Sequence, residues 1–169
     1  LNFAIAGATG EVAGNAIKLM AGVDIRNTPY KGAGPAVVAL MSGEADLMFT
    51  NYVAVEQLIS RGKIRLLGIT AAQRNPRLPN VPTIAEGGLE GYAVEMWYGL
   101  FMPAKTPPAI INAVHRETSR IAATAEFREK MEATGHTVVN STPAEFTEKV
   151  KSEVEKFRKI IIASKMQQD

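Results

Sequence analysis

The chain has 169 residues, which is the length of one domain or slightly more. Hydrophobic residues make up 46% of the sequence and charged residues 21%, as in an ordinary globular protein, so a mainly disordered chain is excluded. The net charge is only +2, and Lys and Arg are scattered, so nothing indicates binding to nucleic acid. No apolar run is long enough to cross a bilayer, so we expect no direct membrane insertion. The absence of cysteine excludes disulfides, thiolate zinc sites and cysteine nucleophiles.

Strands and helices are predicted to alternate in the first part of the chain. Apolar runs predict four strands, over residues 1–6, 23–28, 45–49 and 64–70. A helix is predicted after each of the first three strands, and a glycine closes each helix. The apolar residues that mark these helices are Val12, Ala16 and Leu19 or Met20, then Val37, Val38 and Met41, then Val55, Leu58 and Ile59. This alternation favours right-handed crossovers and a mostly parallel sheet, so the predicted fold class is α/β.

The most informative stretch is residues 28–36 (TPYKGAGPA), where the second strand runs into a helix. Pro29 favours extended backbone before it, and Pro35 suits the first position of a helix. Gly32 and Gly34 permit a tight turn between the two prolines. The amides and the dipole at such a helix start favour a carboxylate or phosphate, so this turn is predicted to form one wall of an anion-binding cleft.

Two other turns are expected beside it. The turns that follow parallel strands all lie at the C-terminal edge of the sheet, where open α/β proteins bind ligands. We therefore expect residues 7–10, 31–34 and 50–51 to share one rim, with a helix N-terminus at each turn and Thr50 and Asn51 capping the third helix.

The rest of the chain is predicted to be mainly helical. Residues 71–91 are polar and rich in turns, with a capping box at Thr83 and Glu86. Residues 92–102 are apolar and are predicted to form a strand that leaves the first lobe. One helix is predicted to begin at Pro107 with Thr106 as its cap, and a shorter helix to run through Phe127 and Met131. A short strand is predicted over residues 136–139. The last predicted helix is capped by Thr142, and its buried face is Phe146, Val150, Val154, Phe157 and Ile161. These amphipathic helices have almost no sheet to cover, so we expect that sheet to lie outside this sequence.

The rim offers few groups for catalysis. Its titratable residues are Lys31 and Glu11, and its hydroxyls are Thr9, Thr50, Tyr30 and Tyr52. The two histidines, His115 and His136, have no metal-ligand spacing, so we predict no catalytic residue and no metal.

One enzyme alternative stays open at the first turn. Residues 7–14 (GATGEVAG) resemble the GATGxxG opening of some nicotinamide-dependent dehydrogenases, whose glycines cradle a pyrophosphate. The match is partial, because Ala13 stands where the third glycine belongs, and Asp24 is not clearly at a strand end. A second alternative is a ligand-sensing regulatory domain with the same type of lobe.

Several motifs together carry a family resemblance. They are residues 20–24 (MAGVD), 29–36 (PYKGAGPA), 43–49 (GEADLMF), 62–65 (GKIR), 78–83 (LPNVPT), 97–100 (WYGL) and 142–146 (TPAEF). In this order they resemble the solute-binding proteins of tripartite tricarboxylate transporters, the Bug family, over essentially the whole chain. The resemblance implies a non-enzymatic periplasmic protein without cofactors. It also implies two lobes of the periplasmic binding protein-like (type II) fold, which close on a small carboxylate and deliver it to membrane transporter subunits.

The resemblance also implies how this chain is organised. It corresponds to the C-terminal half of a member, with the signal peptide and the first lobe outside the sequence given. Residues 1–92 would form the second ligand-binding lobe, residues 93–103 a crossing strand or hinge, and residues 104–169 a helical segment that returns to the first lobe or pairs with another chain.

The ligand-facing positions that the resemblance implies lie in the three turns. They are Gly7, Ala8 and Thr9, then Lys31, Gly32, Ala33 and Gly34, then Thr50 and Asn51. Family members often carry Asp at the position of Thr50 and His at that of Glu11, and Thr50 favours a ligand without an amino group. Three helix termini on an open lobe supply too little free energy for tight binding, so we expect this chain alone to bind carboxylates weakly.

Overall fold

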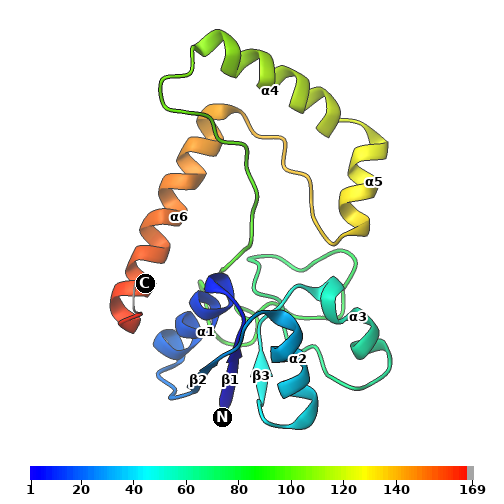
Figure 1. Cartoon of the computed structure of the whole chain (residues 1–169), viewed down its shortest axis with the longest axis vertical. Helices are drawn as coiled ribbons and strands as arrows, with labels where there is room; N and C mark the ends of the chain where they lie inside the picture. The colour runs from blue at the N-terminus through cyan, green and yellow to red at the C-terminus, as the bar shows by residue number, and fades with distance from the viewer. Residues whose placement is uncertain (167–169) are drawn as a thin grey trace. The chain divides into compact units, whose positions relative to one another are not determined.

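The computed structural model describes residues 1–166. Its elements are β1 (Asn2–Ile5), α1 (Ala8–Ala21), β2 (Arg26–Pro29), α2 (Ala33–Ser42), β3 (Leu47–Met48), α3 (Tyr52–Ser60), α4 (Pro108–Ala122), α5 (Ala125–Ala133) and α6 (Pro143–Ser164) (Figure 1). The chain divides into two compact units. The first unit is Leu1–Met96 together with the end of the chain from Phe157, and the second is Trp97–Lys156.

The predicted α/β fold with a parallel sheet is confirmed in the first unit. Strand β1 lies in the middle of a three-stranded sheet of order β2-β1-β3, and both pairings are parallel. Helix α1 packs very closely on this sheet, since a Cβ on Gly14 would lie 2.0 Å from Cε1 of Phe3. The helix ends predicted at Gly22 and Gly43 are also confirmed, because both glycines adopt the left-handed conformation that favours glycine.

The strand predicted over residues 64–70 is wrong. Only one bridge forms there, a parallel one between Ile69 and Thr83. Its hydrogen bonds are Ile69 N to Pro82 O (2.9 Å) and Ile84 N to Ile69 O (2.9 Å). The ladder does not extend because its partner is a turn that contains Pro82, and proline has no N–H to donate.

In the first unit, α1 and α2 bury mainly small side chains, although the sequence pattern of both helices also contains large apolar residues. Leu19, Met20, Val38 and Met41, which belong to the apolar pattern of α1 and α2, are 43%, 46%, 66% and 49% exposed. The buried helix residues include Ala13, Ala16, Ala36 and Ala39, so α1 and α2 approach the sheet through alanines. Near α1, the core is completed by Tyr92 and Val94, with Phe157, Ile160 and Ile161 from the end of α6 packed against it.

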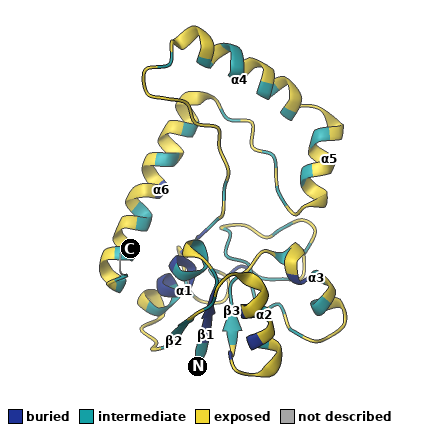
Figure 2. Ribbon diagram, in the orientation of Figure 1, coloured by how far each residue is buried: buried dark blue, intermediate teal, exposed yellow. Residues whose placement is uncertain are grey.

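In the second unit, α4 and α5 bury no residue, and most of their surface is exposed (Figure 2). Residues 92–102 form no strand, and neither do residues 136–139, so the strands predicted in both places are wrong. Instead, Phe146 of α6 contacts the rings of Trp97 and Phe101, with centroids 5.6 and 5.4 Å apart. A strand needs a partner for its backbone groups, and the described part of this unit provides none.

Helix starts in the second unit follow the predictions only in part. The capping box of α6 is confirmed, since Glu145 N donates to Thr142 Oγ1 (3.2 Å) and Thr142 N donates to Glu145 Oε2 (2.8 Å). The cap predicted at Thr106 is wrong, because α4 begins after Pro107 without a side-chain cap. On the predicted buried face of α6, Val154 is 57% exposed, whereas Glu153 is buried and its Oε1 binds Lys149 and Lys156.

Candidate anion-binding site

The strand register brings the three predicted turns to one edge of the sheet. In β1, Ile5 is paired with Pro29 of β2, and Ala4 is paired with Met48 of β3. The first and second turns begin two residues after the Ile5–Pro29 pair, and the third turn begins two residues after Met48, so the three turns leave the sheet at levels that agree to within one residue. Neighbouring strands lie about 4.8 Å apart, so the turns span about 10 Å, with the first turn in the middle. The structure thus brings together the residues that were predicted to share a rim.

The first turn begins α1 without a side-chain cap. Gly7 is the N-cap residue with φ 88°, a conformation that favours glycine. Gly7 and Ala8 are exposed, and Thr9 is half-buried in the first turn of the helix. A Cβ on Gly10 would lie 3.5 Å from the carbonyl oxygen of Phe49, so the start of α1 lies against the end of β3. The first and third turns are therefore neighbours.

The second turn begins α2 in the same way. Gly32 is the N-cap residue with φ 99°, and no side chain caps the helix. Lys31, Gly32, Ala33 and Gly34 are all exposed. The helix starts at Ala33, so Pro35 is its third residue and not its first, which corrects the prediction. A proline is tolerated there because the first turn of a helix has no intrahelical acceptor for its N–H groups.

Tyr30 does not offer its hydroxyl to this rim. Its side chain packs against the alanine cluster that contains Ala36 and Ala39. Its hydroxyl donates to Oε1 of Glu44 (2.8 Å), and this hydrogen bond raises the pKa of Tyr30. Glu44 comes before β3 in the chain, at the edge of the sheet opposite the candidate rim. The Tyr30 hydroxyl therefore points away from the rim, and Tyr30 contributes to packing on the sheet.

The third turn places Asn51 at the start of α3. Asn51 is the N-cap residue by its backbone, but its side chain makes no capping hydrogen bond, so the predicted side-chain cap is wrong. Both Thr50 and Asn51 are exposed. Their side chains stay available at the rim because neither is used to cap the helix.

The three rim helices share the absence of a side-chain cap. None of α1, α2 and α3 has one, and α2 and α3 have no acidic residue in the first turn. Among the other helices, Thr124 caps α5 and Thr142 caps α6, whereas α4 also lacks a side-chain cap. Helix N-terminal amides that lack a side-chain acceptor, together with the helix dipole, favour an anion. The rim therefore offers three such helix starts and the Lys31 ammonium.

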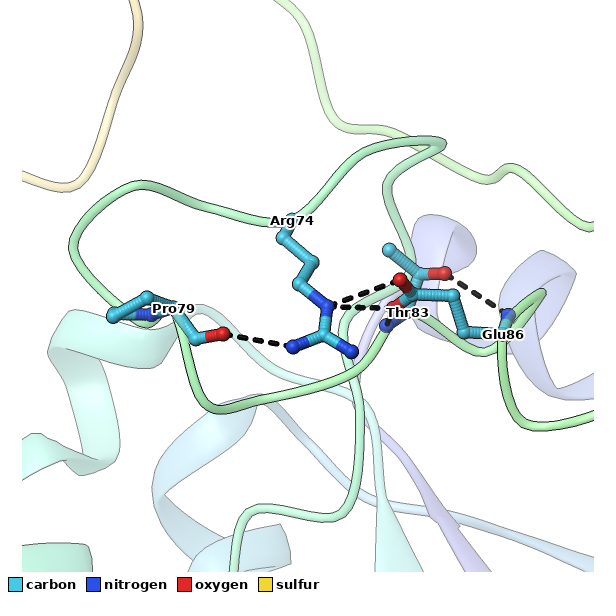
Figure 3. A network of polar contacts seen from close by, with 4 residues as sticks. All are labelled: Arg74, Pro79, Thr83 and Glu86. Carbon is cyan, nitrogen blue, oxygen red and sulfur yellow. Dashed lines mark hydrogen bonds and ion pairs between the residues drawn. The ribbon is translucent and has the colours of Figure 1, made fainter.

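Sequence reasoning missed the hydrogen-bonded loop that Arg74 closes. Arg74 Nε donates to both carboxylate oxygens of Glu86 (3.0 and 2.9 Å), and its Nη1 donates to Pro79 O (2.8 Å) (Figure 3). The predicted capping box at Thr83 is confirmed, since Glu86 Oε2 accepts from Thr83 N (2.7 Å). The Thr83 amide and then Arg74 lower the pKa of Glu86, so its carboxylate stays charged. This network fixes the loop that carries Arg77.

Within residues 1–166, no group of His, Asp and Glu side chains could hold a metal ion. No helix in that range is long and apolar enough to span a bilayer. His115 Nδ1 contacts Ser119 Oγ (3.3 Å), and His136 Nδ1 contacts Thr134 Oγ1 (2.9 Å). Both histidines belong to the second unit.

Comparison with known proteins identifies the family. Residues 2–166 match the profile of the tripartite tricarboxylate transporter family receptor. The chain belongs to this family. It is 34% identical over 143 residues to the UPF0065 protein of the tcbD-tcbE intergenic region of Pseudomonas sp. strain P51, which covers 84% of this chain and 43% of that protein. The family consists of solute-binding receptors rather than enzymes, in contrast to the oxidoreductase alternative.

Two solved structures of similar proteins have the same fold. One is R. palustris Rpa4515 with adipate, with a TM-score of 0.82, 29% identity, and coverage of 97% of this chain and 56% of that one. The other is the periplasmic binding protein BugD, with a TM-score of 0.79, 28% identity, and coverage of 100% of this chain and 58% of that one. The chain therefore spans about half the length of each of these three relatives.

Proposed function

We propose that this chain forms one ligand-binding lobe of an extracytoplasmic solute-binding protein. The complete protein would hold a small carboxylate between two lobes in the periplasm and pass it to the membrane subunits of a tripartite transporter. The observation that carries this proposal is the set of three helix N-termini without side-chain caps at one edge of the sheet. Membership in the receptor family and the adipate bound to one similar protein support it.

We assign the ligand contacts to the residues of the three turns. Backbone amides near Gly7, Ala8 and Thr9 would lie in the centre of the rim, because β1 is the central strand. Lys31, Gly32, Ala33 and Gly34 would contact the ligand from one side, and Thr50 and Asn51 from the other. A small carboxylate can accept hydrogen bonds from these groups without any chemical change, so we infer no catalytic residue and no cofactor.

The free energies involved explain why a second lobe is required. One helix terminus stabilises an exposed anion by about 0.3 to 1 kcal/mol, and by about 2 kcal/mol when partly buried. Micromolar binding needs about 8 kcal/mol, so three termini on an open surface fall short. We infer that the remaining contacts come from the part of the family's length that this chain does not cover.

The same reasoning gives a role to the rest of the chain. Residues 1–92 would act as the second lobe, residues 93–103 as the crossing segment, and residues 104–169 as helices that pack on the first lobe. The scarcity of buried apolar residues in α4 and α5 supports this role, because amphipathic helices need a surface to cover.

Calorimetric titration of the 169-residue chain tests the proposal. We expect adipate to bind with a dissociation constant of about 1 mM, and the neutral diamide of adipate not to bind, because the helix termini select negative charge. Equal binding of the diamide would contradict carboxylate recognition. A sub-micromolar constant would contradict the need for a second lobe.

A further inference from the structure

One apolar segment of the second unit, residues 97–102 (WYGLFM), has a covered side. Phe146 of α6 contacts the rings of Trp97 and Phe101, with centroids 5.6 and 5.4 Å apart. Between these two positions, a Cβ on Gly99 would lie 2.0 Å from Cζ of Phe146. Every second residue of the segment therefore faces Phe146. This is the pattern of extended backbone, in which successive side chains point to opposite sides.

The other side of the segment is open. Tyr98, Leu100 and Met102 are 72%, 71% and 36% exposed, and the ring of Phe101 is still 68% exposed. Figure 1 shows the segment as a stretched trace that leads to α4. Exposed apolar residues in a consecutive run mark a contact surface, because folded monomers rarely leave such a patch in water.

The backbone of the segment is also available. Among the described residues, the backbone groups of residues 99–102 form no hydrogen bond with the rest of the chain. Directly after them, Thr106 N donates to Pro103 O (2.9 Å), which closes a turn and ends the extended run. Extended backbone with free N–H and C=O groups is a template on which another strand can pair.

The charges around the segment favour a second copy of the same segment, running in the opposite direction. No charged residue occurs between Glu95 and Lys105, and Leu100 is the midpoint of this run. Antiparallel pairing about Leu100 sets unlike charges at both ends, whereas parallel pairing sets like charges together. It also places Gly99 of one copy opposite Phe101 of the other, so two rings do not compete for one position.

We propose that residues 97–102 form a self-pairing surface, on which a second copy of this chain adds its own residues 97–102 as an antiparallel strand centred on Leu100. The contact is isologous, since the same segment is used by both copies around a two-fold axis. The inference is independent of the proposed function, because it involves no ligand and no residue of the three turns. Either one can fail alone.

Sedimentation velocity of the 169-residue chain, from about 10 µM to about 1 mM, tests the pairing. We expect a monomer–dimer equilibrium with a dissociation constant of about 100 µM, because a six-residue contact is small. Leu100→Lys should weaken it about tenfold or more, since it places two like charges opposite each other on the axis. Ile110→Lys is the matched control, because Ile110 is a 51% exposed apolar residue of α4 in the same unit. It should leave the constant unchanged.

The absence of cysteine allows the register to be tested as well. In a pair centred on residue 100, the two side chains of Leu100→Cys face each other with Cβ atoms about 5 Å apart, close to disulfide geometry. Met102→Cys is the control on the same side of the segment, because its two thiols would be about 13 Å apart along the strands. With oxidised glutathione, Leu100→Cys should form the disulfide-linked dimer about fivefold faster or more.

Each of the other outcomes would overturn the inference. A chain that stays monomeric at all concentrations would show that this surface is left for a partner other than a second copy. Equal weakening by Leu100→Lys and Ile110→Lys, or no weakening by Leu100→Lys, would place the dimer contact elsewhere. Equal crosslinking of the two cysteine variants would exclude the register. Circular dichroism of each variant checks that it is folded, and adipate should bind Leu100→Lys as it binds wild type.

Discussion

The two units of the chain differ in what they bury. The first unit encloses two apolar clusters, and Phe3 and Ala4 in its central strand are almost completely buried. In the described part of the second unit, the only buried residue is Glu153, and the exposed side chains include Tyr98, Leu100 and Phe101 at 72%, 71% and 68%. A unit without a buried apolar core gains little from the hydrophobic effect. The first unit is therefore expected to determine the stability of this chain.

The largest expected effect comes from matched phenylalanine truncations. Phe3→Ala should lower the free energy of unfolding by about 3 to 5 kcal/mol, because it removes a ring that is 1% exposed. Phe146→Ala removes the same ring from the second unit, where it is only half-buried, and should cost about 1 kcal/mol. Urea unfolding followed by circular dichroism measures both values. Equal losses would contradict the difference between the two units.

A smaller effect is expected from adding side chains at two glycines. A Cβ at Gly14 would lie 2.0 Å from the ring of Phe3, and a Cβ at Gly99 would lie 2.0 Å from the ring of Phe146. The initial overlap is the same, but the fully buried Phe3 has no room to move. Gly14→Val should therefore destabilise the chain by about 3 kcal/mol, and Gly99→Val by about 1 kcal/mol or less. Thermal unfolding of the two variants should differ accordingly, and a greater loss for Gly99→Val would reverse the comparison.

The smallest predicted effect is a pH dependence in the second unit. The backbone hydrogen bond from Thr142 lowers the pKa of Glu145 below the usual range of a glutamate. A carboxyl whose pKa is lowered by folding contributes stability above its unfolded pKa, and this contribution is lost as the pH falls through the folded value. Glu145→Gln should therefore make stability less dependent on pH between about pH 6 and about pH 3. Parallel curves for wild type and Glu145→Gln in urea unfolding would show that the capping box contributes nothing.

The sequence predicted features that depend on local backbone chemistry. Glycines marked the ends of α1 and α2, and the capping boxes at Thr83 and Thr142 formed as expected. The alternation of strands and helices predicted the parallel sheet, and the sheet topology then placed the three turns together. These inferences succeeded because each depends on a few neighbouring residues or on the order of the elements.

Features that depend on distant contacts were not predictable in the same way. Tyr30 belongs to the key turn motif, but its hydroxyl binds Glu44, fourteen residues later. The large apolar residues Val38 and Met41 stay exposed because α2 packs through Ala36 and Ala39. Arg74 holds its loop by binding Glu86, which lies twelve residues later in the chain. The spacing of apolar residues along a helix does not show which face of that helix packs against a three-stranded sheet.

The central claim is that the three turns form one anion site, and amide mapping by NMR tests it most directly. The assigned ¹H–¹⁵N spectrum of the 169-residue chain would be recorded during titration with adipate at constant ionic strength. We expect the largest shifts at the amides near Gly7, Gly32 and Asn51, all with the same midpoint. Shifts confined to one turn, different midpoints for the three turns, or the largest shifts in residues 97–156 would contradict the claim.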